Sequence, residues 1–353
     1  MPPRRAQRWQ PRRLRWWRGT QGGPAGDGEP ARARPRRPAT PLSNPGRQTR
    51  AVPTLFALGG VWGGSFLFIK VIVDETGPLE VVAGRLFFGA LAVGAYVLVT
   101  RHKMIVTPSL VARVAILAML ANVMPFALIS WGEQHIESGT ASVLNAMVPI
   151  FTAVVAAVAL DEEHFTRARL GGLLLGFVGV AVLTGTESLD VTDAAVAGQL
   201  AVVGAALCYG LGAVYMRSLL REQDPVSLTM LQLVLALVIA SVALVAVSGT
   251  PDYSLSLEAW GSLLVLGTLG TGIGYVAFVW LIENIGSVRA SLVTYIVPVL
   301  ALLLGWLVLD ESIGVNTIAG FLLIIGGVAT VMRGQAPSRQ RLQEPVAPAA
   351  VGE

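Results

Sequence analysis

The chain has 353 residues, of which 54% are hydrophobic and 14% charged, whereas soluble domains carry roughly 25% charged residues. This composition excludes an ordinary water-soluble protein. The formal net charge is +4, but 13 of the 26 Lys and Arg lie in residues 1–50. These basic residues therefore do not form the basic surface of a nucleic-acid-binding protein, and no nucleic acid is expected as a partner. The chain has a single cysteine, which excludes an internal disulfide. Its three histidines are widely separated in the sequence, so we predict no metal site and no bound cofactor.

Both ends of the chain differ in composition from its body. Residues 1–50 hold 13 Arg and nine Pro with few aliphatic side chains, which is too little apolar surface to offset the entropy lost on folding. We therefore predict a disordered cytoplasmic tail at 1–50 and a second one at 335–353. Arg12-Arg13 is not followed by the apolar run of about 7–15 residues that a cleaved signal peptide requires. Translation that begins near Val52 is an alternative explanation of the unusual composition.

Between the tails lie apolar stretches close to the ~20 residues that cross ~30 Å of hydrocarbon. Turn and charge signals separate them, as at Asp74–Pro78 and Gly249–Asp252. These joints are short, so successive helices are neighbours. The pattern predicts an all-α membrane protein with ten transmembrane helices, at 52–73, 79–100, 108–129, 134–158, 167–186, 196–218, 226–249, 258–281, 286–309 and 314–333.

The distribution of Lys and Arg predicts the orientation, because short loops rich in these residues stay in the cytoplasm. With the amino terminus inside, the inner side holds the Arg-rich tail together with Arg101, Arg167 and Arg217, and the outer loops hold almost no basic residues. We therefore expect a multi-pass protein of the plasma membrane, in contact with the lipid bilayer, with both termini in the cytoplasm.

The body of the chain contains an internal repeat. Residues 131–185 align with 280–334 without a gap, which pairs Trp131 with Trp280 and also matches a Val-Pro and a Leu-Asp-Glu in one register. Apolar composition alone could match Leu with Val, but it does not explain Trp, Pro and Asp-Glu in the same register.

The two halves, 51–186 and 194–334, thus contain five predicted helices each. An odd number of spans makes the second half enter the bilayer from the opposite side, so the repeat is predicted to be inverted. Many secondary transporters use inverted repeats to build a site at the membrane midplane and to open it alternately to each side.

The run Trp62–Lys70 (WGGSFLFIK) in the first span and Arg85 in the second resemble the EamA type of the drug/metabolite transporter superfamily, and the likeness covers about 52–334. Trp62–Lys70 is similar to the opening motif of that family, and Arg85 stands where its second helix usually carries an arginine. Pro149 with the following run to Asp161-Glu162-Glu163, and Pro298 with the run to Asp310-Glu311, resemble its paired signature in the fourth and ninth helices. The resemblance implies two five-helix domains and export or uptake of small metabolites, often amino acids or related compounds.

Arg85 is the first candidate for a substrate-binding residue. It lies about six residues inside the second predicted span, where a charge costs at least a few kcal/mol unless it pairs, snorkels or faces water. It would bind an anionic group of the substrate or form part of a gate. The alternative is a structural arginine that pairs with Glu80 or reaches the interface. Its counterpart in the second half is Gln232, which is polar but uncharged.

Uncharged polar and aromatic side chains deep in the spans form a second group. A buried amide must find hydrogen-bond partners, which neighbouring helices provide as well as a substrate does, so packing and ligand contact both stay open for each residue. As a set they fit a mostly apolar cavity with a few orienting polar groups. The candidate cavity residues besides Arg85 are Trp62, Asn122, Trp131, Asn145, Tyr209, Gln232, Tyr275, Thr294 and Tyr295.

Four further residues are candidates for gating or coupling. Lys70, near the outer end of its span, either takes part in gating or snorkels and pairs with Asp74. Glu133, at the start of the fourth predicted span, either takes up protons that drive transport or is an exposed loop carboxylate. Pro149 and Pro298 remove backbone donors and kink their helices, either as bending points or as static kinks.

The sequence therefore predicts a secondary carrier, most simply an exporter, of small metabolites such as amino acids. A passive channel or facilitator on the same fold, and a membrane assembly factor that does not transport, are the alternatives. Phosphate-binding loops and hydrolase motifs are missing from the sequence, so an enzyme is not expected. Small-residue motifs such as Gly172-x-x-x-Gly176 fit packing within the chain and, as an alternative, a homodimer.

Overall fold

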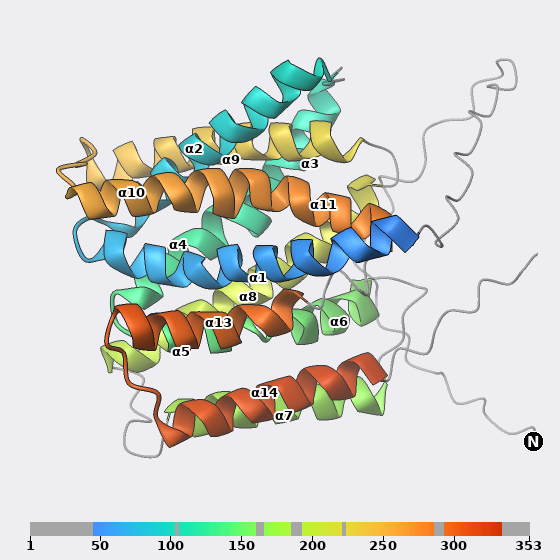
Figure 1. The fold of residues 1–353 in the computed structure, drawn as a ribbon, viewed down its shortest axis with the longest axis vertical. Helices are drawn as coiled ribbons and strands as arrows, with labels where there is room; N and C mark the ends of the chain where they lie inside the picture. The colour runs from blue at the N-terminus through green and yellow to red at the C-terminus, as the bar shows by residue number, and fades with distance from the viewer. Residues whose placement is uncertain are drawn as a thin grey trace, which may run out of the picture. The chain divides into compact units, whose positions relative to one another are not determined.

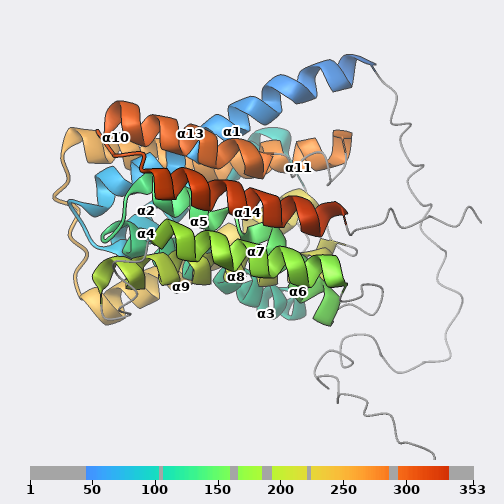
Figure 2. The ribbon, with the colours of Figure 1, turned by 90° about the horizontal axis from the view of Figure 1, so that it is seen from below.

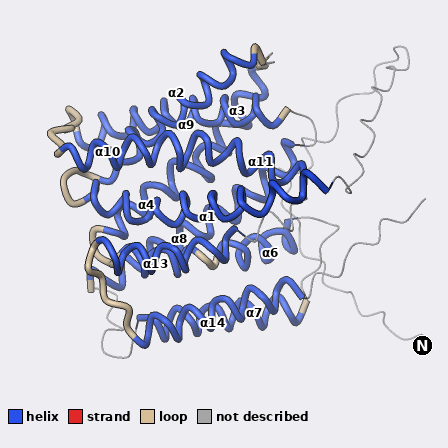
Figure 3. The backbone as a smooth tube through the Cα atoms, in the orientation of Figure 1, coloured by secondary structure: helices blue, strands red, loops and turns tan. Residues whose placement is uncertain are grey.

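The computed structural model describes residues 45–102, 106–159, 166–184, 193–220, 224–285 and 293–333. Within these ranges all regular elements are helical (Figure 3). Nine of the described helices are long and apolar enough to cross a membrane, and a shorter apolar helix follows at Val293–Val308. The predicted tail at 335–353, residues 1–44 of the other tail and the Asp161-Glu162-Glu163 signature lie outside the described residues.

The described helices divide between the two halves of the chain. The first half consists of α1 (Pro45–Val73), α2 (Pro78–Thr100), α3 (Pro108–Ala118), η2 (Met119–Val123), α4 (Met124–Glu133), α5 (Ser138–Asn145), α6 (Val148–Ala159) and α7 (Arg167–Thr184). The second half consists of α8 (Ala194–Leu220), α9 (Pro225–Ser248), α10 (Leu257–Val265), η3 (Leu266–Ile273), α11 (Gly274–Ile285), α13 (Val293–Val308) and α14 (Val315–Arg333). Helix α1 begins at Pro45, earlier than the predicted start of the first span at residue 52.

The third and eighth spans are each interrupted by a π-helical segment, η2 between α3 and α4 and η3 between α10 and α11. Hydropathy does not reveal such segments, which widen the helix and disturb its regular hydrogen bonding. Pro125 is the second residue of α4, directly after η2. The third span therefore continues to Glu133, past its predicted end at residue 129.

The fourth span is divided into α5 and α6, with a turn at residues 146–147. Pro149 is the second residue of α6, whereas its repeat counterpart Pro298 lies inside the continuous helix α13. A proline in the first turn of a helix lacks an N–H that would have no helical partner anyway. The two aligned prolines therefore have different local effects in this conformation.

The extensive helix contacts join one half of the chain to the other. Helix α1 packs on α13, α2 on α9 and η3, α4 on α8, and α7 on α14. Figures 1 and 2 show the pairs α1–α13 and α7–α14 side by side in both views. The halves are therefore interlocked, and α2, α4, α8, α9 and η3 together enclose the interior in which the polar residues described below are found.

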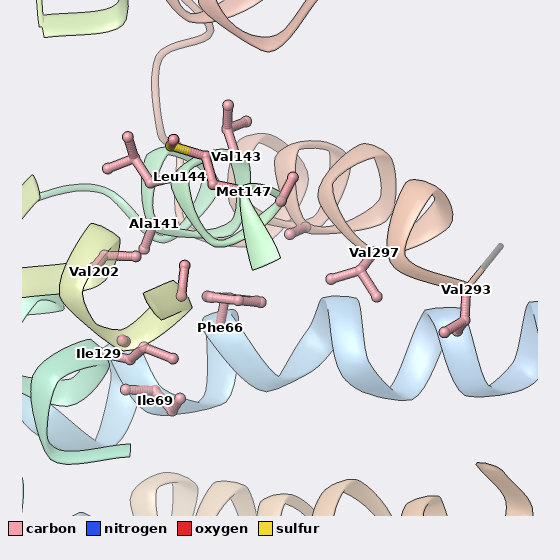
Figure 4. Close-up of a cluster of buried hydrophobic side chains, with 14 of the residues drawn as sticks. Phe66, Ile69, Ile129, Ala141, Val143, Leu144, Met147, Val202, Val293 and Val297 are labelled. Carbon is pink, nitrogen blue, oxygen red and sulfur yellow. The ribbon is translucent and has the colours of Figure 1, made fainter. Parts of the chain in front are cut away.

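The main hydrophobic core lies where α1, α4, α5, α8 and α13 meet. Figure 4 shows Phe66 and Ile69 of α1 beside Ile129 of α4, with Val202 of α8 and Val297 of α13 nearby. All five side chains are buried. They fix the relative position of helices from both halves.

The outward faces of the helices are apolar as well. On α7, Leu170, Leu174 and Val178 are all exposed and recur at the spacing of one helix face. Apolar surface of this extent is unusual on a soluble monomer. It fits helices whose outer sides contact lipid.

At one end of the helices, connections from the two halves contact each other. We call this end the Glu75 face, defined by the connections 74–77, 134–137, 249–256 and 309–314. Glu75 accepts hydrogen bonds from the backbone N–H and the hydroxyl of Ser256, at 2.7 and 2.6 Å. Glu311 accepts from the backbone N–H groups of Ser138 and Gly139, at 2.7 and 3.0 Å. These carboxylates hold the connections of the two halves together.

The Glu75 contact predicts a pH-dependent contribution to stability. Hydrogen bonds from the Ser256 side chain and backbone hold the pKa of Glu75 below its ordinary value of 4.5. A carboxylate with a lowered pKa in the folded state stabilises the protein above the pKa of the unfolded chain, and this stabilisation is lost as the pH falls through the lowered pKa. Glu75→Gln should therefore lower the unfolding temperature in detergent at neutral pH, and the difference should shrink on acidification. The exposed Glu258→Gln is the control, and a Glu75→Gln difference that stays constant with pH would contradict the prediction.

Candidate functional site

Arg85 lies in the interior, on the face of α2 that contacts η3. Only 8% of it is exposed. Its Nε donates a hydrogen bond of 2.7 Å to Thr271 Oγ1, and its Cζ lies 3.8 Å from the centroid of the Phe126 ring. Within the described part of the chain no carboxylate pairs with Arg85, so the pairing with Glu80 that the sequence left open is not formed.

Small residues bring α2 and η3 close enough for this contact. A Cβ on Gly89 would lie 2.8 Å from Thr271 Cγ2, and one on Gly267 would lie 2.9 Å from the Arg85 carbonyl oxygen. Such close backbone approach is typical of helix interfaces in membranes. The glycines therefore position Thr271 beside the Arg85 guanidinium.

A second polar contact lies near Arg85 and is equivalent, by the sequence repeat, to the contact between Arg85 and Thr271. Gln232 Nε2 donates to Asn122 Oδ1, and Asn122 Nδ2 donates to the Tyr275 hydroxyl at 3.1 Å. Gln232 aligns with Arg85 in the repeat. Asn122 lies nine residues before Trp131, and Thr271 lies nine residues before Trp280, so Asn122 and Thr271 align as well. The contacts Arg85–Thr271 and Gln232–Asn122 are thus equivalent in the two halves, with a cation in one and an amide in the other.

Aromatic side chains complete the surroundings of Arg85. The rings of Phe126 and Tyr209 pack edge to face with centroids 6.5 Å apart. Tyr209 and Tyr275 both lie within electrostatic reach of the guanidinium. We call the following group the central polar cluster: Arg85, Asn122, Phe126, Tyr209, Gln232, Thr271 and Tyr275.

Sequence reasoning named five members of this cluster and missed Phe126 and Thr271. A signal for both was present in the repeat. Phe126 and Tyr275 each stand five residues before an aligned tryptophan, and Thr271 aligns with Asn122 in the same register. Applying the repeat to the candidates would therefore have added both residues.

The other predicted cavity residues are distributed around the cluster or away from it. Trp62 adjoins it, because its Nε1 donates to the Gly270 carbonyl of η3 at 2.9 Å. Trp131 is 38% exposed and packs on His135. Tyr295 donates to Met332 Sδ. Asn145 lies in α5 and Thr294 in α13, and neither helix contributes a residue to the central polar cluster.

Lys70 and Glu133 meet at the Glu75 face. Lys70 Nζ lies 3.6 Å from Asp74 Oδ1, which confirms the expected ion pair. It also donates a 2.7 Å hydrogen bond to the main-chain oxygen of Glu133. Glu133 is the last residue of α4 and is 0% exposed. The alternative that Glu133 is an exposed loop carboxylate is therefore wrong, because the third span extends further than hydropathy indicated.

The central polar cluster has the chemistry of a site for an anionic group on a small organic molecule. A guanidinium forms strong charge-assisted hydrogen bonds with carboxylates, and the aromatic rings offer apolar surface to the rest of such a ligand. Among the described residues no group of three His, Cys, Asp or Glu side chains could hold a metal ion.

The family model described as "EamA-like transporter family" matches the chain twice, at residues 50–185 and 196–333. A curated relative from Bacillus subtilis (strain 168), named "Uncharacterized transporter YoaV", is 30% identical over 76% of this chain and 91% of its own. A "Probable terminal-alkyne amino-acid exporter" of Streptantibioticus cattleyicolor is 27% identical over 84% and 98% of the two chains.

A further relative, from Chlamydia trachomatis serovar L2, is named "S-adenosylmethionine/S-adenosylhomocysteine transporter". It is 26% identical over 78% of this chain and 87% of its own. A solved crystal structure superposes with a TM-score of 0.58 at 21% identity, covering 80% of this chain and 98% of the other. At this identity the match shows a shared fold.

Proposed function

Because the chain belongs to the EamA-like transporter family, we propose that it is a secondary carrier that exports small metabolites bearing a carboxylate, such as amino acids or related compounds. Membership makes it a multi-pass membrane transporter of small molecules. The observation that carries the substrate class is Arg85, a buried guanidinium that forms no ion pair within the described residues. A buried cation without a counter-ion is costly, and the carboxylate of a substrate would compensate it.

The substrates named for two relatives support this class. One is named as an amino-acid exporter and one as a transporter of S-adenosylmethionine. Both kinds of molecule contain an α-amino-acid carboxylate. The aromatic members of the central polar cluster would contact the rest of the substrate.

The proposed mechanism is alternating access between two five-helix inverted repeats, 51–186 and 194–334, with ten spans in all. The equivalent contacts Arg85–Thr271 and Gln232–Asn122 support it, because they lie where both repeats meet. In this conformation the contacts of Glu75 and Glu311 link connections of the two repeats, and in the proposed mechanism the Glu75 face is the closed side. We place that face outside and both termini in the cytoplasm, from the distribution of Lys and Arg.

The test is uptake and counterflow in liposomes that contain the purified protein. A panel of labelled amino acids would be compared with matched amines that lack the carboxylate. We expect saturable counterflow for carboxylates only. Flux that never saturates and shows no counterflow would indicate a channel or facilitator. Absence of flux for the whole panel, with correctly inserted protein, would contradict the carrier proposal.

Thr271 should position Arg85 within the proposed site. Thr271→Val keeps the shape of the side chain but removes the acceptor of the Arg85 Nε hydrogen bond, a loss of about 1–3 kcal/mol for a buried partner. We expect about a 10-fold higher KM for counterflow with a smaller change in maximal rate. Thr268→Val is the matched control, because its hydroxyl donates to the Leu264 carbonyl on an exposed part of η3. Equal effects of the two substitutions would contradict the positioning role.

A further inference from the structure

Glu133 is a buried carboxyl group whose two side-chain oxygens have no hydrogen-bond partner in the described part of the chain. The residue is 0% exposed. Burying an ionised carboxylate without a partner costs far more than burying the neutral acid. The surroundings of Glu133 in this conformation therefore favour the protonated form.

The end of α4, next to Glu133, packs closely on α8. A Cβ on Gly132 would lie 2.7 Å from Val202 Cγ2 and 2.9 Å from the Gly198 carbonyl oxygen, both in α8. Glu133 also lies on the same face of α4 as Phe126 and Ser130, at helical spacing, and both of these are buried. Two helical turns, about 10 Å, separate it from the central polar cluster.

Charged and titratable groups reach Glu133 from several elements packed around α4. Helix α1 brings Lys70, the connection 74–77 brings Asp74, α2 brings Arg85, and the connection after α13 brings Glu311. Helix α8 contributes Tyr209, which packs on Phe126, and α5 (SGTASVLN) contains no ionisable side chain. Two of these groups are cations and two are carboxylates, so their charges offset one another, and the burial of Glu133 remains the reason that the protonated form is favoured.

Lys70 is the cation best placed to stabilise an ionised Glu133. Its Nζ already donates to the main-chain oxygen of Glu133 at 2.7 Å and lies 3.6 Å from Asp74. It thus contacts the residue without contacting its carboxyl group. A small movement would transfer the ammonium group from Asp74 and the main-chain oxygen to the side chain of Glu133.

We propose that Glu133 is a proton-binding site that couples transport to proton movement. With the Glu75 face closed, the carboxyl group holds its proton and Lys70 pairs with Asp74. When this face opens and water reaches α4, Glu133 releases the proton to water, and the resulting carboxylate pairs with the Lys70 ammonium group. The net charge of the pair changes by one as the proton leaves, so each passage between the two states moves one proton. This inference rests on the proposed carrier function.

The experiment compares wild type with Glu133→Gln in liposomes that contain a pH-sensitive dye. The labelled amino acid with the strongest wild-type counterflow is the probe. In wild type, an imposed pH gradient should drive uphill accumulation, and addition of substrate should move protons. Glu133→Gln should keep counterflow within about threefold but lose at least 10-fold of the pH-driven accumulation. Retention of pH-driven accumulation in Glu133→Gln would overturn the proposal.

Glu137→Gln is the matched control, because Glu137 lies four residues away and is only partly buried. It accepts a hydrogen bond from the Ser312 hydroxyl at 3.1 Å, which the amide oxygen of glutamine can also accept. We expect it to keep its response to the pH gradient. Glu133→Asp should restore part of the response that Glu133→Gln loses.

Infrared spectroscopy provides a measurement that does not depend on transport. Wild type at neutral pH should show a protonated carboxyl band that is missing from Glu133→Gln and present in Glu137→Gln. Identical spectra in this region would overturn proton binding at Glu133. Saturable wild-type counterflow that is indifferent to pH would overturn the coupling alone. Absence of counterflow in wild type would contradict the carrier function, and the infrared result would still decide whether Glu133 binds a proton.

Discussion

Arg85→Gln is expected to abolish most transport of carboxylate substrates while the protein stays folded. Removing one partner of a buried, hydrogen-bonded charge pair costs about 2–5 kcal/mol, and about 3 kcal/mol corresponds to roughly a 100-fold loss of affinity. Without substrate, however, Arg85 is a buried charge with no ion-pair partner among the described residues. Its replacement by a neutral amide should leave the unfolding temperature unchanged or raise it. Counterflow at subsaturating substrate and thermal unfolding in detergent measure the two effects.

A loss of transport without a loss of thermal stability would distinguish a substrate-binding role of Arg85 from a structural one. A purely structural Arg85 would lose stability and transport together in Arg85→Gln. Arg101→Gln makes the same chemical change on an exposed residue at the end of α2, and it should alter neither quantity appreciably. Arg85→Gln with undiminished counterflow of carboxylates would exclude Arg85 from the substrate site.

The double variant Arg85→Gln with Gln232→Arg uses the repeat as a further control. Arg85 and Gln232 occupy aligned positions, and each donates a hydrogen bond to a polar residue of the other half. If a cation in the central polar cluster is what binds the carboxylate, moving it to the equivalent position should restore at least 10-fold of the lost transport. The single variant Gln232→Arg, which keeps Arg85, should not show a 10-fold increase in transport over wild type.

The membrane spans could be predicted from the sequence because their signal is local. About 20 apolar residues in succession satisfy the bilayer regardless of what packs beside them. The position of Arg85 inside the second span was also predictable, and it marked Arg85 as a candidate because a charge so far from the ends of its span needs a reason to be there. Its partners were not predictable from composition, since Thr271 lies far away in the chain and meets it only through the packing of α2 on η3.

The burial of Glu133 could not be predicted for a different reason. A carboxylate near a predicted span boundary is usually in a connection, and hydropathy ended the third span at residue 129. The π-helical segment η2 and the following α4 carry the helix on to Glu133. Neither the inserted π turn nor the close contact of Gly132 with α8 changes the hydropathy profile, so the position of this side chain depends on tertiary structure.

The contact between α7 and α14 should be among the most sensitive to small changes in side-chain size. A Cβ on Gly172 would lie 2.5 Å from Val331 Cγ2 and 2.6 Å from the Gly327 carbonyl oxygen. The second contact is with backbone, which cannot move aside as a flexible side chain does. Gly172→Ala should therefore push the two helices apart and destabilise the protein by about 1–3 kcal/mol, the usual cost of overpacking. Thermal or denaturant unfolding in detergent would measure the loss.

Gly171 provides the matched control at the adjacent position of the same helix. A Cβ there meets no atom within 4 Å, so Gly171→Ala gains the better helix propensity of alanine, about 0.5–1 kcal/mol, without a clash. The two neighbouring substitutions should consequently change stability in opposite directions. Helix association in a membrane depends strongly on close packing, since lipid offers apolar side chains an equally apolar environment. Equal stability of Gly172→Ala and Gly171→Ala would mean that the close approach of α7 and α14 is not needed to hold these helices together.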